Sequence, residues 1–208
     1  AFGGSFAYIH GSDSSGSSNN AVDSDQYELA AHWRGQWGPL LAFARVSAAK
    51  VNFSGTRHFE NGDVVRTANG EWDGDLYSAT AGLSYQLQFD RFSLRPAVGI
   101  DYYRLKEDGY AETGGGDAFD LTVLGRTSDE TTANGTITAG YDFGSLNRAD
   151  GWVRLELEGG RRQIIGGSLG NTTAYFKDGD QFTLVAEDRT NGWTGRARLY
   201  GGPDTFPI

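Results

Sequence analysis

A period of two in the hydrophobic pattern restricts the fold of this chain more than any other feature. In residues 77–87 every second residue is apolar, and the residues between are small or polar. The apolar residues are Tyr77, Ala79, Ala81, Leu83, Tyr85 and Leu87. Residues 26–34 and 153–158 repeat the pattern. Because successive side chains of a strand point to opposite faces, each segment predicts a β-strand with one apolar and one polar face.

The polar faces of these segments carry full charges in mid-strand, and the apolar faces carry aromatic residues near the strand ends. This distribution is typical of a transmembrane β-barrel with a polar lumen. The longest apolar stretch, residues 39–44, is far shorter than the roughly 20 residues that a spanning helix needs. We therefore predict an all-β fold, an antiparallel up-and-down transmembrane β-barrel. A soluble β-sandwich that acts as a binding module is the alternative.

The alternation predicts about nine strands, with long and short connections between them. The expected strands are residues 1–10, 26–34, 39–53, 76–87, 92–106, 119–126, 131–143, 152–162 and 193–200. Polar tracts at 11–25, 54–75 and 106–117 predict long loops, and 35–38, 88–91 and 127–130 predict tight turns. Residues 145–151 are expected to be a link, and 166–189 a small hairpin or an edge. Long loops on one side and tight turns on the other are typical of outer-membrane barrels.

Composition limits the possible partners. The length of 208 residues suits a single domain over residues 1–208. A net charge of -9 leaves no basic stripe for phosphates, so we expect no nucleic-acid partner. The chain has no cysteine, which excludes disulfides and thiolate metal sites.

No group of residues predicts catalysis. His10, His32 and His58 lie in separate segments, so we expect no metal site, no cofactor and no enzyme activity. Glu156 and Glu158 point the same way, about 7 Å apart by strand rise. A glycosidase needs a similar spacing, but the neighbouring arginines favour ion pairs instead.

Charged residues on the polar faces are the main candidates for a functional role. They are Arg45, Lys50, Arg95, Asp101, Arg154, Glu156, Glu158, Arg196 and Arg198. A charge in bare hydrocarbon would cost about 2–4 kcal/mol at the bilayer midplane, so these side chains should face a lumen filled with water or protein. They either pair with one another or hold a segment that threads the pore.

Several stretches of the chain resemble a known family in both content and order. Residues 4–8 read Gly-Ser-Phe-Ala-Tyr, and residues 78–85 read Ser-Ala-Thr-Ala-Gly-Leu-Ser-Tyr. Residues 94–105 read Leu-Arg-Pro-Ala-Val-Gly-Ile-Asp-Tyr-Tyr-Arg-Leu, and Tyr-Ala-Glu follows at 110–112. From residue 1 to 202 the chain resembles the C-terminal translocator barrel of autotransporters, the type V secretion systems of Gram-negative bacteria.

The resemblance implies a twelve-stranded outer-membrane barrel with a threading helix. About nine of those strands are visible, so we expect the domain to be partial at both ends. The implied function is to anchor a passenger domain and export it to the cell surface, with the long loops extracellular. The implied partners are outer-membrane lipid, the protein's own passenger and threading helix, and the barrel assembly machinery. A porin with a solute-selective lumen, or a structural barrel with adhesive loops, is the alternative.

Overall fold

The computed structural model describes residues 1–15, 19–144, 152–186 and 189–202. Within these ranges the chain consists of β-strands and their connections. No helix in this part of the chain is long and apolar enough to cross a membrane. The predicted all-β fold is confirmed.

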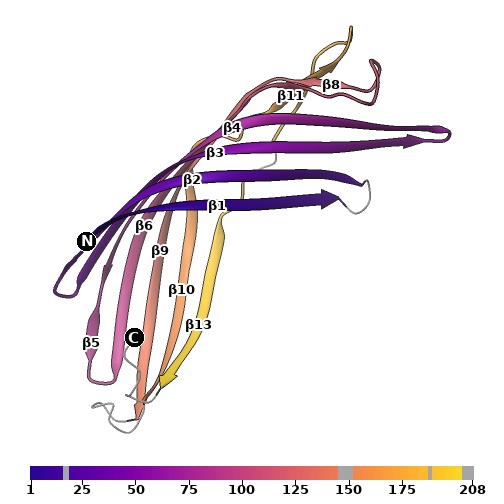
Figure 1. The fold of residues 1–208 in the computed structure, drawn as a ribbon. Helices are drawn as coiled ribbons and strands as arrows, with labels where there is room; N and C mark the ends of the chain where they lie inside the picture. The colour runs from indigo at the N-terminus through magenta and orange to yellow at the C-terminus, as the bar shows by residue number, and fades with distance from the viewer. Residues whose placement is uncertain (16–18, 145–151, 187–188, 203–208) are drawn as a thin grey trace.

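Nine strands form one antiparallel sheet whose long members follow the order of the chain (Figure 1). The order is β1–β2–β3–β4–β6–β9–β10–β13, and the short β5 pairs with β6. The bounds are Phe2–Ser15 (β1), Asn20–Trp37 (β2), Leu40–Asn61 (β3), Val64–Tyr85 (β4), Leu87–Phe89 (β5), Phe92–Glu107 (β6), Arg126–Gly144 (β9), Trp152–Gly166 (β10) and Gly192–Gly202 (β13). This arrangement confirms the predicted antiparallel meander.

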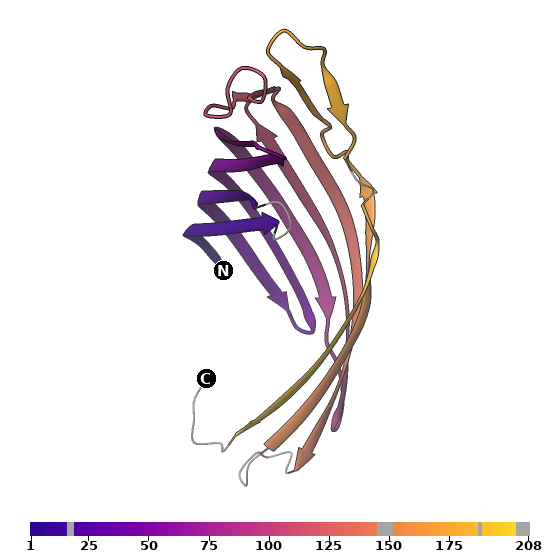
Figure 2. The same ribbon diagram turned by 90° about the vertical axis from the view of Figure 1, so that its right-hand side faces the viewer.

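The main sheet curls into a half-barrel (Figures 1 and 2). Strand twist and tilt bend a wide antiparallel sheet in this way. In the described part of the chain, β1 and β13 are the edge strands of this sheet. The curl gives the sheet two faces that differ in chemistry.

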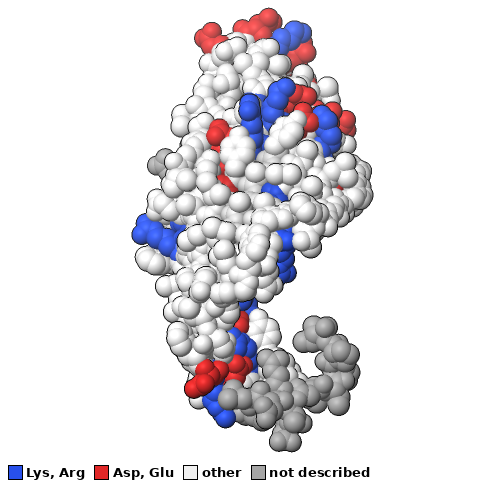
Figure 3. Space-filling model, turned by 90° about the vertical axis from the view of Figure 1, so that its left-hand side faces the viewer, with Lys and Arg blue, Asp and Glu red and all other residues white. Residues whose placement is uncertain are grey.

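Side chains alternate between these two faces along each long strand. The outer face carries Tyr77, Leu83 and Leu157, which are 49, 49 and 54% exposed. The inner face carries Arg45 and Asp101, which the register aligns with Thr80 between them. Figure 3 shows broad uncharged areas on one side of the molecule, with mixed groups of acidic and basic residues near its upper and lower ends and a few basic residues between them.

Two of the predicted long loops are instead the paired ends of long hairpins. β1 pairs with β2 as far as Ser15 and Asn20, so most of residues 11–25 are strand. β3 and β4 have 22 residues each and remain paired to Asn61 and Val64. The loop prediction was wrong because it required an apolar outer face, whereas backbone hydrogen bonds also hold a ladder whose outer face is polar.

Four short strands form a second antiparallel sheet at the long-hairpin end of the main one. They are β7 (Tyr110–Ala111), β8 (Leu121–Val123), β11 (Thr172–Phe176) and β12 (Phe182–Leu184), in the order β12–β11–β8–β7. The β11–β12 pair confirms one of the two expectations for residues 166–189, a small hairpin.

The predicted strand at 131–143 is confirmed as part of a longer strand, but the predicted turn at 127–130 and the bounds of the strand at 119–126 are wrong. Arg126–Gly144 is one continuous strand, and only Leu121–Val123 is separate from it. Residues 127–130 are polar, but they continue the ladder with β6 and therefore do not turn. The predicted link at 145–151 lies outside the described residues.

Candidate functional site on the inner face

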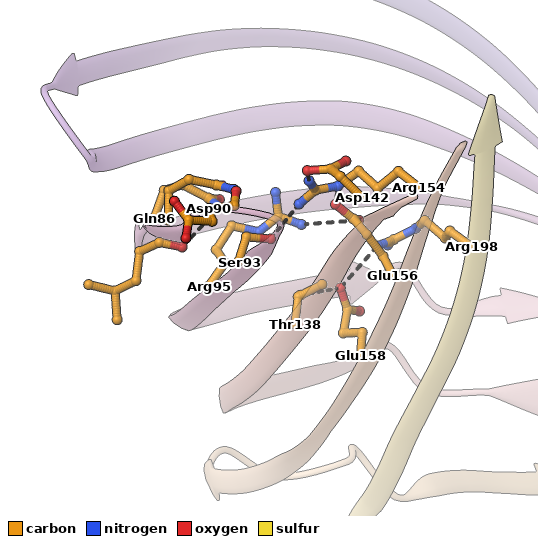
Figure 4. Close-up of polar contacts among 12 residues, drawn as sticks. Gln86, Asp90, Ser93, Arg95, Thr138, Asp142, Arg154, Glu156, Glu158 and Arg198 are labelled. Atoms are coloured by element: carbon orange, nitrogen blue, oxygen red, sulfur yellow. Dashed lines mark hydrogen bonds and ion pairs between the residues drawn. The ribbon is translucent and has the colours of Figure 1, made fainter. Parts of the chain in front are cut away.

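Charged side chains from β6, β9, β10 and β13 meet on the inner face (Figure 4). Arg154 Nη1 donates to Asp142 Oδ2 at 2.8 Å, and its Nε donates to Glu156 Oε1 at 2.9 Å. Glu156 Oε2 lies 3.6 Å from Arg198 Nη1 and 3.8 Å from Arg95 Nη2. The Glu156 side chain is only 11% exposed, so its ion pairs are largely shielded from water.

Glu158 extends these contacts by one row of the sheet. Thr138 Oγ1 donates to Glu158 Oε2 at 3.2 Å, and Arg198 Nη1 donates to the same oxygen at 3.3 Å. Arg196 Nη1 lies 3.9 Å from Glu158 Oε1, and its side chain is 62% exposed. The β10–β13 register places Glu156 opposite Arg198 and Glu158 opposite Arg196.

We name this set of side chains the inner-face charge network. Its members are Arg95, Asp142, Arg154, Glu156, Glu158, Arg196 and Arg198.

A glycine makes room for the longest contact of the network. Arg154 Nη2 donates to Ser93 Oγ of β6 by crossing Gly140, which lies between them on β9. A Cβ at residue 140 would lie 2.5 Å from Arg154 Nη2 and 2.6 Å from Ser93 Oγ. Arg95 likewise reaches Glu156 from two strands away. Such contacts are favoured on the hollow side of a curved sheet, where side chains converge.

Two residues of the predicted set lie on the inner face but outside this network. Arg45 pairs with Glu28 of β2, and Ser47 Oγ donates to the second oxygen of that carboxylate at 3.0 Å. Asp101 accepts a hydrogen bond from Asn134 Nδ2 at 2.8 Å. Each is held by a local partner on a neighbouring strand.

The expectation that Lys50 shares the polar face with Arg45 is wrong. The two positions differ by an odd number of residues, so their side chains point to opposite faces of β3. Lys50 lies on the outer face, where its Nζ is 2.5 Å from Asp75 Oδ1 and its side chain is 69% exposed.

Sequence reasoning missed the carboxylates that hold several of these arginines. Asp142 lies opposite Arg154 across β9 and β10, and Glu130 of β9 contacts both Arg162 and Arg189. The alternation already placed Asp142 on one face with Thr138 and Gly140. Finding its partner required the strand register, which the alternation does not specify.

The network has the character of a fixed charge array. Its arginines remain protonated at any physiological pH, and its glutamates are engaged by guanidinium groups. His10 Nδ1 contacts Asp25 Oδ1 at 2.9 Å, and His58 Nδ1 contacts Thr67 Oγ1 at 2.9 Å, both away from the network. Across the described ranges, no group of three or more His, Cys, Asp or Glu side chains is placed to hold a metal ion.

The autotransporter beta-domain family model matches residues 1–200. This chain belongs to that family. The domain is an outer-membrane translocator barrel and not an enzyme. None of the curated proteins compared with the chain matches it. The family match confirms the resemblance that the sequence motifs indicated.

The outer face of this autotransporter beta-domain has the features of a lipid-facing surface. Aromatic residues lie toward both ends of an apolar band, for example Tyr77 at one end of it and Tyr85 at the other, both on β4. Their separation of eight residues corresponds to about 27 Å of extended strand, which is about 20 Å along the membrane normal at a strand tilt of about 40°; the apolar band of membrane barrels is about 25 Å tall. Val98, which lies opposite Leu83 of β4, is 61% exposed, and Leu157 on the outer face of β10 is 54% exposed. Membrane lipid is the environment that matches this surface.

Beyond the apolar band, a strap formed by residues 108–125 crosses the inner face of β3 and β4. Arg57 Nε and Nη2 donate to the two oxygens of Glu112 at 3.1 and 2.6 Å, and these bonds raise the pKa of the guanidinium above its usual value. The Tyr110 ring stacks on Trp72 with centroids 4.4 Å apart. Burial raises the pKa of the Tyr110 phenol above its ordinary value.

The strap also covers part of β4 that β6 leaves unpaired. β6 pairs with β4 only from Gly74 onward, whereas Asn69 and Thr113 exchange two backbone hydrogen bonds of 2.8 Å. An exposed strand edge is prone to pair with other chains, so this contact protects the long hairpin.

Proposed function

We propose that this domain anchors a passenger domain in the outer membrane and exports it to the cell surface. Membership of the autotransporter beta-domain family and the inner-face charge network support this proposal. The network consists of arginines and carboxylates in mutual contact rather than of a nucleophile and a base. Such a surface suits a conduit better than a catalyst.

The charged residues of the inner face then line the lumen of the closed barrel. They are Arg45, Arg95, Asp101, Arg154, Glu156, Glu158, Arg196 and Arg198. A charge that faced hydrocarbon would cost about 2–4 kcal/mol at the midplane, so a water-filled or protein-filled lumen is the favourable environment. A wall of paired charges offers an unfolded passenger few apolar contacts, so the passenger can pass without adhering.

The central ion pairs link neighbouring strands on the inner face. Two guanidinium groups are available to form hydrogen bonds to another segment. Arg95 and Arg196 are 38 and 62% exposed, and among the described residues each makes one long ion pair, of 3.8 and 3.9 Å. Their free donors can form hydrogen bonds to the threading helix of the same protein. This division of roles predicts that no single carboxylate is indispensable.

The long hairpins are the extracellular end in this proposal, and the short turns are periplasmic. β2 and β3 join through residues 38–39 alone, whereas β3 and β4 continue far beyond the apolar band. Outer-membrane barrels have this asymmetry. The barrel assembly machinery is the expected partner for insertion, and outer-membrane lipid contacts the outer face.

Passenger exposure on intact cells, scored by cleavage with added protease, tests the proposal. We expect Glu158→Gln to leave exposure largely unchanged, because one ion pair contributes little. We expect the double reversal Arg95→Glu with Arg196→Glu to lower passenger exposure several-fold. It replaces two positive charges with two negative ones and so changes the electrostatic potential inside the lumen. Lys177→Glu is the matched control, since Lys177 is 60% exposed and pairs with Asp117, away from the network.

Heat-modifiable electrophoretic mobility must show that each variant barrel has folded in the membrane. Loss of exposure in Glu158→Gln would contradict the proposal, because it would indicate a specific site. Absence of passenger exposure by the folded wild-type protein, together with a solute flux that the double reversal alters, would favour the porin alternative.

A further inference from the structure

We propose that Arg104 and Lys106 form a binding site on the outer face for the phosphate-bearing headgroup of a membrane lipid. The lipid belongs to the leaflet on the side of the long hairpins. Both residues are exposed and lie two positions apart on β6, so their side chains share one face of the sheet.

In the part of the chain that the structure describes, these two cations differ from most others because neither has a carboxylate partner. Arg57, Arg126 and Lys50 each contact a carboxylate at 2.5 or 2.6 Å. Within the ranges that the structure describes, Arg104 and Lys106 make no ion pair. In a chain with a net charge of -9, two adjacent unpaired cations are available to an external anion.

The position of Arg104 and Lys106 along the strand, next to the tyrosines at one end of the apolar band, indicates that the external anion is a lipid headgroup. Arg104 is two residues beyond Tyr102 on β6, and the register places it directly opposite Tyr77 of β4. Tyrosine is enriched at the boundary between hydrocarbon and headgroups, and arginine and lysine near that boundary extend their charges toward the headgroups. Anionic lipids are recognised by basic residues at this depth.

The neighbouring carboxylates allow the proposal to be tested in both directions. Asp75 lies opposite Lys106 but is engaged by Lys50 at 2.5 Å. Asp129 lies opposite Arg104 on β9 and would repel a phosphate bound there. Removing the charge of Asp129 should therefore strengthen binding, and removing the two cations should weaken it.

The experiment measures lipid retention by the complete protein, purified in detergent, with native mass spectrometry. The probes are diphosphorylated lipid A and the same lipid A after enzymatic removal of its phosphates. We expect the wild type to retain the phosphorylated form in preference. Arg104→Gln with Lys106→Gln should reduce that retention roughly tenfold or more, and Asp129→Asn should increase it. Lys177→Gln, the loss of an exposed cation elsewhere, should change nothing.

Three results would overturn the proposal. The first is equal retention of lipid A by the wild type and a folded double variant, and the second is equal retention of the two lipid forms by the wild type. The third is displacement of lipid A by millimolar inorganic phosphate, which would assign the residues to a free anion. If the double variant does not fold, the Asp129→Asn variant tests the proposal instead. Unchanged retention of lipid A by the Asp129→Asn variant would then contradict a binding site at Arg104 and Lys106.

Discussion

Arg154 can reach Ser93 only because residue 140 between them has no side chain. We therefore expect Gly140→Ala to displace the guanidinium and lower the free energy of unfolding by about 1–3 kcal/mol. Gly135→Ala on the same strand is the control, because no heavy atom lies within 4 Å of the Cβ it would add. Chemical denaturation of the refolded protein in lipid vesicles measures both. If the two variants are equally stable, the hydrogen bond from Arg154 to Ser93 does not depend on a glycine at residue 140, and the prediction is wrong.

A second residue-scale prediction concerns the outer face. Leu157 lies on the outer face of β10 and is 54% exposed. Leu157→Arg should cost about 2–4 kcal/mol of stability in a lipid-refolding titration, because it places a charge in hydrocarbon near midplane. Ile165→Arg, near the long-hairpin end of β10, should cost only about 0–1 kcal/mol. A negligible effect at both positions would favour a soluble sandwich.

For single residues, the sequence predicted the face of the strand on which a side chain lies but not the residues that the side chain contacts. The alternation correctly separated Leu157 from Glu156, because the period of two is a local property of one strand. It did not identify Gly140 or Asp142 as parts of the network. Those roles depend on the register among β6, β9 and β10, which no single strand contains.

The strap of residues 108–125 is the element that most departs from the expected loop. Glu112 accepts both hydrogen bonds from Arg57 and one of 2.9 Å from the Leu121 backbone N–H. Glu112→Gln should weaken the bond to Arg57 by about 1–3 kcal/mol and loosen the strap. Limited proteolysis should then cut within 108–125 faster than in the wild type.

Glu71→Gln serves as the control for the strap, because Glu71 is an exposed carboxylate of β4 that makes no ion pair in the described ranges. If the Glu112 and Glu71 variants are cut at equal rates, the Arg57–Glu112 contact does not hold the strap. Local opening should occur without loss of the barrel, since the strap lies beyond the apolar band.

Elements within the apolar band were predictable, and those beyond it were not. The strands at 152–162 and 193–200 were found because lipid demands an apolar outer face there. The far halves of β3 and β4 carry polar side chains on the outer face, and their apolar residues, such as Phe59 and Trp72, lie on the inner face against the strap. The apolar outer face that marked the other strands is therefore missing there, and backbone pairing is not visible in a single sequence.

The half-barrel in the membrane is the central claim at the scale of the whole molecule. Apolar side chains on the outer face and charged side chains on the inner face are both explained by lipid on one side and an aqueous lumen on the other. A soluble sandwich would instead bury one of these faces against a second sheet.

Single-cysteine scanning along β9 tests this claim most directly. The chain has no cysteine, so each introduced thiol is unique. In outer-membrane vesicles, we expect a small water-soluble methanethiosulfonate to label Asn134→Cys and Thr136→Cys but not Ile137→Cys or Ala139→Cys. A lipid-phase quencher should reach the second pair alone when a fluorophore is attached. Uniform labelling of all four positions, without a period of two, would contradict a lipid-facing outer surface and an aqueous inner one.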